Sequence, residues 1–183
     1  MRIISGRLKG RQLVGFKAGH IRPTTDRVKE TLFNILMGDV PGARVLDLFA
    51  GTGNLGIEAL SRGASYVECV EVNKSSLRII ADNLKSLGIQ KEIKVTASDV
   101  FKYLKSYKAE PFDIIFIDPP FTEAIAHKCM EAASTTQAAK IGTIFVIESS
   151  RHERIDDAYG PLRLLDRRAF GDKSASFFQK GEG

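Results

Sequence analysis

The residues best suited to chemistry follow the apolar run Phe112–Ile117, and they are Asp118, Pro119, Pro120 and Phe121. Two consecutive prolines fix the backbone and carry no amide hydrogen, so the Asp118 carboxylate and the Pro119 carbonyl lack a local donor. Two such acceptors can bind both hydrogens of an exocyclic aromatic amine and free its lone pair, while the aromatic side chain stacks the base. The tetrad therefore predicts a site that prepares a ring amine to accept a methyl group held in line with it. A rigid turn at a strand end is the structural alternative.

Gly51, Gly53 and Gly56 form a loop with G-x-G-x-x-G spacing between a predicted strand and a predicted helix. Glycines at these positions let the backbone turn sharply and let a ligand approach the main chain around Thr52. Glu71 lies twenty residues after Gly51, at the end of the next predicted strand, where a carboxylate can accept hydrogen bonds from ribose hydroxyls. This arrangement predicts a cofactor that contains a nucleoside, and a nicotinamide or flavin dinucleotide is one candidate.

Two further acids bear on the choice of cofactor. Asp47 precedes the first glycine by four residues and places negative charge beside the loop. Such a charge suits the ammonium and sulfonium groups of S-adenosyl-L-methionine and is unfavourable near a pyrophosphate, so this cofactor is preferred. Asp99 follows the third predicted strand, where its carboxylate can accept from an adenine amino group. Either acid can instead be a cap, Asp47 of the loop and Asp99 of a short helix that begins at Val100.

The surplus of positive charge is confined to the N-terminal segment. Residues 1–40 contain eight basic and three acidic residues, and this difference of five equals the formal net charge of the whole chain, +5. Clustered Lys and Arg beside an otherwise neutral body favour a polyanionic partner, because neutralising phosphates releases counterions. A solvated tail is the alternative. We expect phosphate contacts, as a group, from Arg2, Arg7, Lys9, Arg11, Lys17 and Arg22.

The remaining pattern predicts the elements that hold these residues in place. From residue 43 onward, apolar runs alternate with helical patterns, and the runs are nearly continuous, as in parallel strands covered on both faces. These runs are residues 43–49, 65–72, 93–98, 112–118 and 142–149. Helices are expected at 54–62, at 73–88 between an Asn73 cap and a Gly88 stop, at 100–104 and at 122–139.

Both ends of the chain add to this pattern. Two more predicted strands, separated by Gly171-Asp172, close the sheet as an antiparallel hairpin. The fold class is therefore α/β, with a doubly wound, mostly parallel, seven-stranded Rossmann-like sheet. Residues 1–16 are predicted to form a β-hairpin, and an amphipathic helix capped by Thr24 or Thr25 follows. The expected organisation is an N-terminal extension at 1–40 and a catalytic domain at 41–183.

Composition argues against several other classes. No apolar run reaches the roughly 18 residues that a membrane helix needs, and the N-terminus has no apolar signal segment. Cys69 and Cys129 are far apart in sequence and form neither a metal-ligand pair nor a disulfide framework, which fits a reducing cytoplasm. The three histidines are scattered, so no metal ion is expected. We expect a cytoplasmic monomer.

The tetrad after the Gly51-x-Gly53 loop resembles the amino-group methyltransferases that use S-adenosyl-L-methionine. Three stretches resemble, more closely, the RsmD family of bacterial 16S ribosomal RNA methyltransferases, which act on the N2 amine of guanine 966. They are Arg22–Leu36, the Asp47–Gly53 loop and the ending Phe170-Gly-Asp-Lys. The resemblance covers nearly the whole chain. It implies a class I methyltransferase fold, S-adenosyl-L-methionine as the cofactor, and 16S ribosomal RNA, naked or within the small subunit, as the partner. The chain departs from the family at Phe121, where many relatives have Tyr, and along residues 173–178.

The resemblance also implies a role for each site residue. The methionine end of the cofactor would be held by Asp47 with the loop Gly51, Thr52 and Gly53. The ribose would be held by Glu71, the adenine by Asp99 and the backbone of Val100, and the guanine by Asp118, Pro119, Pro120 and Phe121.

The predicted reaction is a single in-line displacement, in which guanine N2 attacks the methyl carbon and its proton passes to Asp118 or to water. Three alternatives remain open. The first keeps the chemistry but acts on DNA adenine or cytosine, or on a protein glutamine. The second is a dinucleotide-dependent oxidoreductase, from the glycine spacing alone. The third is a non-catalytic RNA-binding assembly factor.

Overall fold

The computed structural model describes residues 1–15, 26–121 and 124–182. Helices and strands alternate along most of the chain, as the apolar runs predict, and the last four elements are all strands. Within the described residues, no helix is both long enough and apolar enough to cross a membrane. The predicted caps Thr24 and Thr25 lie outside the described part of the chain.

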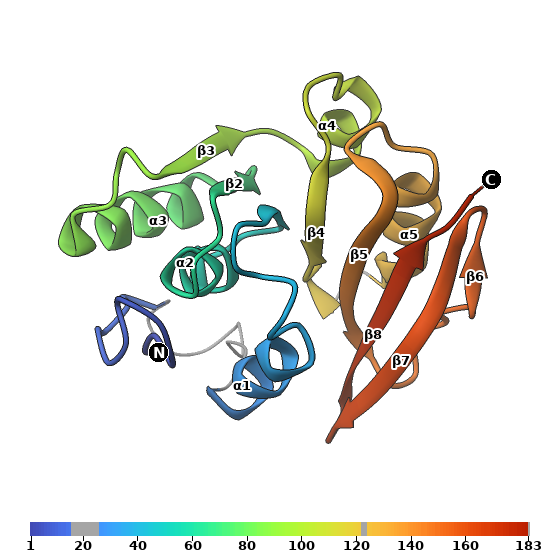
Figure 1. Cartoon of the computed structure of the whole chain (residues 1–183), viewed down its shortest axis with the longest axis horizontal. Coiled ribbons are helices and arrows are strands. Elements are labelled where there is room, and N and C mark those ends of the chain that lie inside the picture. The colour runs from blue at the N-terminus through green and yellow to red at the C-terminus, as the bar shows by residue number, and fades with distance from the viewer. Residues whose placement is uncertain (16–25, 122–123, 183) are drawn as a thin grey trace.

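Eight strands form one sheet in the order β3-β2-β1-β4-β5-β8-β7-β6 (Figure 1). The parallel strands are β1 (Arg44–Leu48), β2 (Tyr66–Glu71), β3 (Ile93–Ala97), β4 (Phe112–Ile117) and β5 (Ala139–Ser150). The antiparallel strands are β6 (Ala158–Tyr159), β7 (Leu162–Phe170) and β8 (Lys173–Lys180). The doubly wound, mostly parallel sheet with a closing hairpin is confirmed. The predicted number of seven strands is one too low, because β6 has only two residues and carries no pattern of its own.

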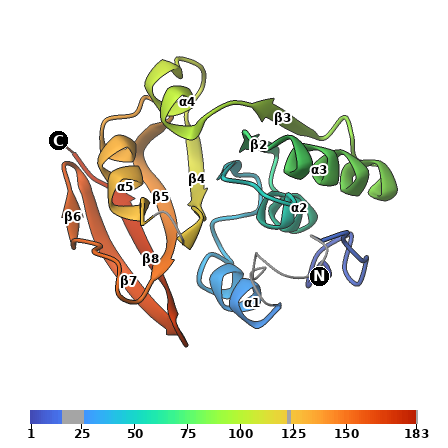
Figure 2. The same cartoon turned by 180° about the vertical axis from the view of Figure 1, so that it is seen from behind.

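Five helices cover the two faces of this sheet, as Figures 1 and 2 show from opposite sides. One face packs against α1 (Asp26–Ile35), α2 (Asn54–Ser61) and α3 (Lys74–Leu87). The other packs against α4 (Val100–Ser106) and α5 (Ala126–Ser134). Each face therefore has its own buried apolar cluster, as expected for a sheet whose strands are apolar on both sides.

Local signals predicted the helix ends well in α3 and less well in α5. The Asn73 side chain accepts from the amides of Ser75 and Ser76, and Gly88 ends α3 in the left-handed conformation, so both predicted caps are confirmed. The helix predicted at 122–139 is too long, since α5 ends at Ser134. Thr136 turns the chain toward β5, because its hydroxyl donates to the Leu104 carbonyl and accepts from the Ala138 amide.

The predicted N-terminal β-hairpin forms only in part. Among residues 1–15 the two arms share one antiparallel bridge, between Arg2 and Gln12, and the amides of Ile3 and Leu13 donate to the carbonyls of Arg11 and Met1, both at 3.0 Å. The amides of Ile4 and Ser5 donate to the Glu58 carboxylate in α2, at 2.9 and 3.0 Å. These two donors are satisfied by another element, so this part of the segment packs on α2 and the arms do not extend into two full strands.

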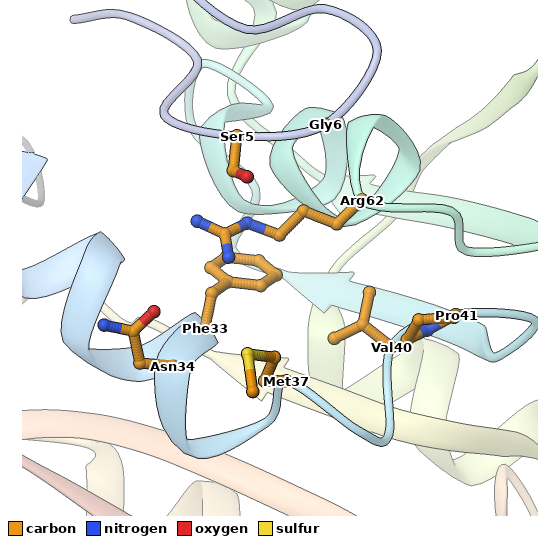
Figure 3. A pocket seen from close by; sticks show the side chains of 8 residues that line it. All are labelled: Ser5, Gly6, Phe33, Asn34, Met37, Val40, Pro41 and Arg62. Atoms are coloured by element: carbon orange, nitrogen blue, oxygen red, sulfur yellow. The ribbon is translucent and has the colours of Figure 1, made fainter.

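A buried ion pair anchors this segment to α1 and α2. Lys29 Nζ and Glu58 Oε2 are 2.9 Å apart, and both side chains are fully buried. Lys29 also donates to the Arg2 carbonyl at 2.6 Å, and burial lowers its pKa although Glu58 opposes the shift. Arg62 Nε binds the other Glu58 oxygen at 2.8 Å, and its guanidinium lies 4.8 Å from the centre of the Phe33 ring (Figure 3). The N-terminal segment therefore packs as part of the core of one face.

Candidate functional site

The carboxyl ends of β1 and β4 lie side by side in the middle of the sheet. The strands pair in parallel with Leu48 opposite Ile117, and the following Asp118 amide donates to the Leu48 carbonyl at 3.4 Å. β2 lies beyond β1 on one side and β5 beyond β4 on the other (Figure 1). This is the point where the strand order reverses, which is where open α/β sheets bind their ligands. The structure thus brings the glycine loop and the tetrad to the same edge of the sheet.

The glycine loop has a backbone that only glycine adopts readily. Gly51 and Gly53 have φ values of 58° and 78°, in the left-handed region. Gly53 is also the N-cap residue of α2, and its amide donates to the Ala50 carbonyl at 2.7 Å. The turn and the start of α2 therefore lie at the edge of the sheet beside the tetrad.

Asp47 is buried beneath this loop. It is the penultimate residue of β1, and its Oδ2 accepts from the Gly56 amide at 2.8 Å. Burial raises the pKa of Asp47 to about 7, with smaller contributions in the same direction from Asp118 and Glu71. The carboxylate thus fixes the start of α2, which is the capping role that the sequence left open as an alternative. Contact between Asp47 and a bound methionine group remains a prediction.

Glu71 ties the glycine loop to the end of β2. One of its carboxylate oxygens accepts from the Gly51 amide at 2.9 Å. The other accepts from the amides of Val72 and Asn73, each at 2.8 Å. Three backbone donors therefore hold this carboxylate at the edge of the sheet, next to the loop. Binding of ribose by Glu71 remains a prediction.

Asp99 is the N-cap of α4, and its Oδ1 accepts from the Lys102 amide at 2.9 Å. The side chain is exposed at the carboxyl end of β3, while Val100 beside it is buried. The capping alternative is therefore present in the structure. A cap that uses one oxygen leaves the predicted contact with adenine compatible with this geometry, and that contact remains a prediction.

The tetrad meets residues from a distant part of the chain. Asp118 and Phe121 are half-buried, and Pro119 is buried. The ammonium of Lys173, the first residue of β8, lies 4.1 Å from the centre of the Phe121 ring. Glu148 in β5 is buried and lies 3.9 Å from the same ammonium. Neither Lys173 nor Glu148 was predicted as a site residue, because a local sequence pattern carries no signal for a contact between segments so far apart.

The basic residues of the N-terminal segment make contacts within the protein. Arg2 pairs with Asp26 at 2.9 Å, Arg7 pairs with Glu92 at 2.5 Å, and both arginine side chains remain about half exposed or more. The Arg11 guanidinium donates to the Ser86 carbonyl at 2.9 Å. Lys9 is exposed, whereas Lys17 and Arg22 lie outside the described residues. These contacts hold the basic segment against the C-terminal end of α3, and RNA binding by it remains a prediction.

Asn83 connects the same segment with the glycine loop. Its side chain is fully buried in α3, and its amide donates to the carbonyls of Thr52 and Val14 at 3.0 and 3.1 Å. Its carbonyl oxygen accepts from the Val14 amide at 2.7 Å. In the sequence Asn83 is an ordinary polar residue of an amphipathic helix, so nothing there indicated this link.

Comparisons with known proteins agree with this geometry. Residues 1–179 match the family described as Conserved hypothetical protein 95. The ribosomal RNA small subunit methyltransferase D of Buchnera aphidicola subsp. Acyrthosiphon pisum (strain APS) is 35% identical over 153 residues, which cover 84% of this chain and 80% of that protein. The protein of the same name from Haemophilus influenzae is 37% identical over 153 residues, covering 82% and 79%.

A solved structure supports the same grouping. The Escherichia coli protein yhhF, which is named as a methyltransferase, has a TM-score of 0.87 and 30% sequence identity to this chain. The match covers 99% of this chain and 98% of that one. The similarity therefore includes both the N-terminal segment and the closing hairpin.

Proposed function

The chain belongs to the RsmD family of methyltransferases, and from this premise we propose that it methylates the N2 amine of a guanine in 16S ribosomal RNA. The proposed nucleotide is guanine 966, and the proposed methyl donor is S-adenosyl-L-methionine. The observation that carries the proposal is the hydrogen bond between the Asp118 amide and the Leu48 carbonyl. It joins the strand end that bears the acceptors to the strand end that bears the cofactor loop.

The residues around the loop fit a cationic cofactor. Asp47, Glu71 and Asp118 come from the ends of three neighbouring strands, and the latter two both raise the pKa of Asp47. Such a cluster of acids attracts an ammonium or sulfonium group and repels a pyrophosphate, which argues against the oxidoreductase alternative. When bound, S-adenosyl-L-methionine supplies a methyl carbon whose bond to sulfur breaks as its bond to nitrogen forms, the electron pair staying on sulfur.

The tetrad prepares and orients the base. The Asp118 carboxylate and the Pro119 carbonyl accept the two hydrogens of the N2 amine, which draws its lone pair out of conjugation. Phe121 stacks the guanine ring, an interaction that contributes ~1–3 kcal/mol per base in related contexts. The proton that N2 loses passes to Asp118 or to water after the new bond forms. The chain thereby acts through placement and hydrogen bonding.

The target base must leave its stack to reach this edge, and unpaired RNA segments permit that at low cost. We propose that residues 1–40 form an RNA-binding extension on a methyltransferase domain at 41–183. Arg2, Arg7, Lys9, Arg11, Lys17 and Arg22 would contact the RNA backbone as a group. The substrate would be 16S ribosomal RNA in the cytoplasm, naked or in the small subunit, and the enzyme would act as a monomer.

Radiolabelled S-adenosyl-L-methionine and unmodified 16S ribosomal RNA test this function. The wild type is expected to incorporate label into the RNA. Asp118→Ala is expected to abolish incorporation while its affinity for the cofactor, measured by calorimetry, stays within about threefold. Asp118→Asn keeps one acceptor oxygen and is expected to retain part of the rate. Normal turnover by Asp118→Ala would refute the assigned role.

A further inference from the structure

We propose that Lys173 is a positioning residue for the target base, acting through the Phe121 ring. Its ammonium, held beside the buried Glu148 carboxylate, covers one face of that ring, so the base stacks only on the opposite face. The inference rests on the proposed function, in which Phe121 is the stacking residue. It adds a residue from the closing hairpin to a site otherwise built on β1, β2, β3 and β4.

The register of the strands places Lys173 near the tetrad. Ile117, the last residue of β4, pairs with Ile147 of β5. The residues that follow each of them, Asp118 and Glu148, therefore lie side by side along the two strands. β8 runs antiparallel to β5, and its first residue, Lys173, pairs with Ser150. The start of β8 therefore lies at the carboxyl edge of the sheet, where the tetrad is.

The turn before Lys173 is held in place from both sides. The Arg151 amide donates to the Asp172 carbonyl at 2.9 Å, and the hydroxyls of Ser149 and Ser174 are 3.0 Å apart. Gly171 supplies the left-handed conformation that the turn needs, with a φ of 62°. The backbone of Lys173 is thus fixed by the hairpin, and its side chain lies against the Phe121 ring.

The surroundings of the ammonium favour its place over the ring. The Lys173 side chain is only 19% exposed, and Glu148, with 2% exposure, lies 3.9 Å from the ammonium. A cation at 4.1 Å from a ring centre is attracted by the negative face of the ring, and this attraction grows as water is excluded. Charge balance with Glu148 and contact with Phe121 therefore act together on one ammonium.

This arrangement makes the two faces of Phe121 unequal. A base that approaches the covered face must displace a partly buried cation, whereas the opposite face accepts it directly. A base stacked on this open face lies at one height relative to Asp118 and Pro119. Lys173 thereby selects the face of Phe121 on which the base stacks, without touching the amine or the methyl carbon.

The variant Lys173→Met tests the proposal, because it keeps an unbranched side chain that is one atom shorter and removes the charge. We expect kcat for RNA methylation to fall about tenfold, as loss of a cation–π contact of ordinary strength predicts, with KM for RNA within about twofold. In RNA with 2-aminopurine at the target position, bound with S-adenosylhomocysteine, quenching of the 2-aminopurine should be weaker. Lys173→Arg keeps a cation over the ring and should restore both signals.

Lys108→Met is the matched control, since Lys108 is exposed between α4 and β4, at the opposite edge of the sheet. Lys108→Met should have the same kcat, KM for RNA and 2-aminopurine quenching as the wild type. If Lys173→Met does not fold, as judged by cofactor binding, Lys173→Gln replaces it with the same expectation. The proposal would be overturned if the folded Lys173 variant, Met or Gln, had the kcat and the 2-aminopurine quenching of the wild type. A weaker salt dependence of RNA binding with kcat intact would also overturn it, because Lys173 would then bind phosphate. If the wild type itself transfers no methyl group to RNA, the proposed function fails first.

Discussion

At the scale of single residues, Asp47 both holds the glycine loop in place and titrates near neutral pH. Asp47 accepts from the Gly56 amide and so shapes the loop, and it lies close enough to Glu71 and Asp118 for both to raise its pKa. A carboxyl with a pKa of about 7 is half protonated at neutral pH. A bound cation nearby favours its ionised form, so proton loss and cofactor binding are linked.

Cofactor affinity should therefore depend on pH. Below about pH 7 Asp47 is mostly neutral and attracts a cation weakly, and above it the carboxylate is ionised. We expect the affinity for S-adenosyl-L-methionine to rise between pH 6 and pH 8, by at most about tenfold per unit. Calorimetry over this range measures it.

Two controls isolate the effect. S-adenosylhomocysteine has a neutral sulfur, so its affinity should change less over the same range. Asp47→Asn keeps an oxygen that can accept from the Gly56 amide but does not titrate, and it should flatten the curve. A steep rise that persists in Asp47→Asn would assign the effect to another group.

Gly56 is a second residue whose type is dictated by contact. A Cβ added there would lie 2.7 Å from Cys69 Sγ and 3.3 Å from Asp47 Oδ2. Gly56→Ala should lower the free energy of unfolding by about 1–3 kcal/mol, as overpacked cores do. Urea denaturation measures this loss.

Cys69→Ala removes the sulfur that the new methyl group would meet. The double variant Gly56→Ala/Cys69→Ala should therefore be more stable than the sum of the two single changes predicts. If the changes in unfolding free energy of the two single variants simply added up, the new methyl group at position 56 would not be clashing with the Cys69 sulfur.

At the scale of elements, the contrast between α3 and the N-terminal segment shows what a sequence can reveal. The Asn73 cap, the Gly88 stop and the apolar strands depend on residues within a few positions of one another, and all were predicted. The N-terminal hairpin was predicted as two strands but forms one bridge, and Glu58, more than fifty residues later, accepts from the amides of Ile4 and Ser5. Contacts of this range leave no periodic signal.

The buried ion pair of α1 and α2 should be important for stability. Lys29→Met leaves the buried Glu58 carboxylate without one of its two cationic partners, and we expect a loss of about 3–5 kcal/mol in the free energy of unfolding. The double variant Lys29→Met/Glu58→Gln removes the uncompensated charge and should recover part of this loss. Equal stability of the single and double variants would contradict the account. The exposed pair Arg154–Asp156 is the control, and Asp156→Asn should change little.

In the candidate functional site, too, motifs that are contiguous in the sequence were predicted and long-range contacts were not. Two of its motifs, the glycine loop and the tetrad, are contiguous in the sequence, and their positions at strand ends were predicted along with the parallel sheet that unites them. Lys173, Glu148 and Asn83 were missed, since each reaches its partner through strand register or helix packing. The sequence also could not decide whether Asp47 and Asp99 act as caps, and the structure shows that both do.

At the scale of the whole molecule, positive charge is distributed unevenly around a sheet that is covered by helices on both faces. The basic N-terminal segment lies beside α2 and α3, far from α4 (Figure 1). Asn83 links this segment to the glycine loop. The segment therefore extends from the glycine loop, which Val14 reaches through Asn83, to the C-terminal end of α3, where Arg7 and Arg11 lie.

RNA binding should be less sensitive to salt when this segment is neutralised. In the triple variant Arg7→Ala/Lys9→Ala/Arg11→Ala, the slope of log affinity against log salt concentration should fall by up to about 2, at ~0.7 per lost phosphate contact. Fluorescence anisotropy at several salt concentrations measures it. A matched triple variant at Lys102, Lys105 and Lys108, in and after α4, should keep the wild-type slope. An unchanged slope in the first variant would mean that the segment does not bind RNA.

The most direct test of the whole account replaces a single atom group in the substrate. Inosine differs from guanosine only in lacking the 2-amino group, so RNA with inosine at the target position keeps every other contact. We predict that labelled S-adenosyl-L-methionine methylates the guanosine RNA, that nucleoside mass spectrometry identifies the product as N2-methylguanosine, and that the inosine RNA receives no label. Methylation of the inosine RNA at the same position would contradict the claim that the tetrad prepares an exocyclic amine.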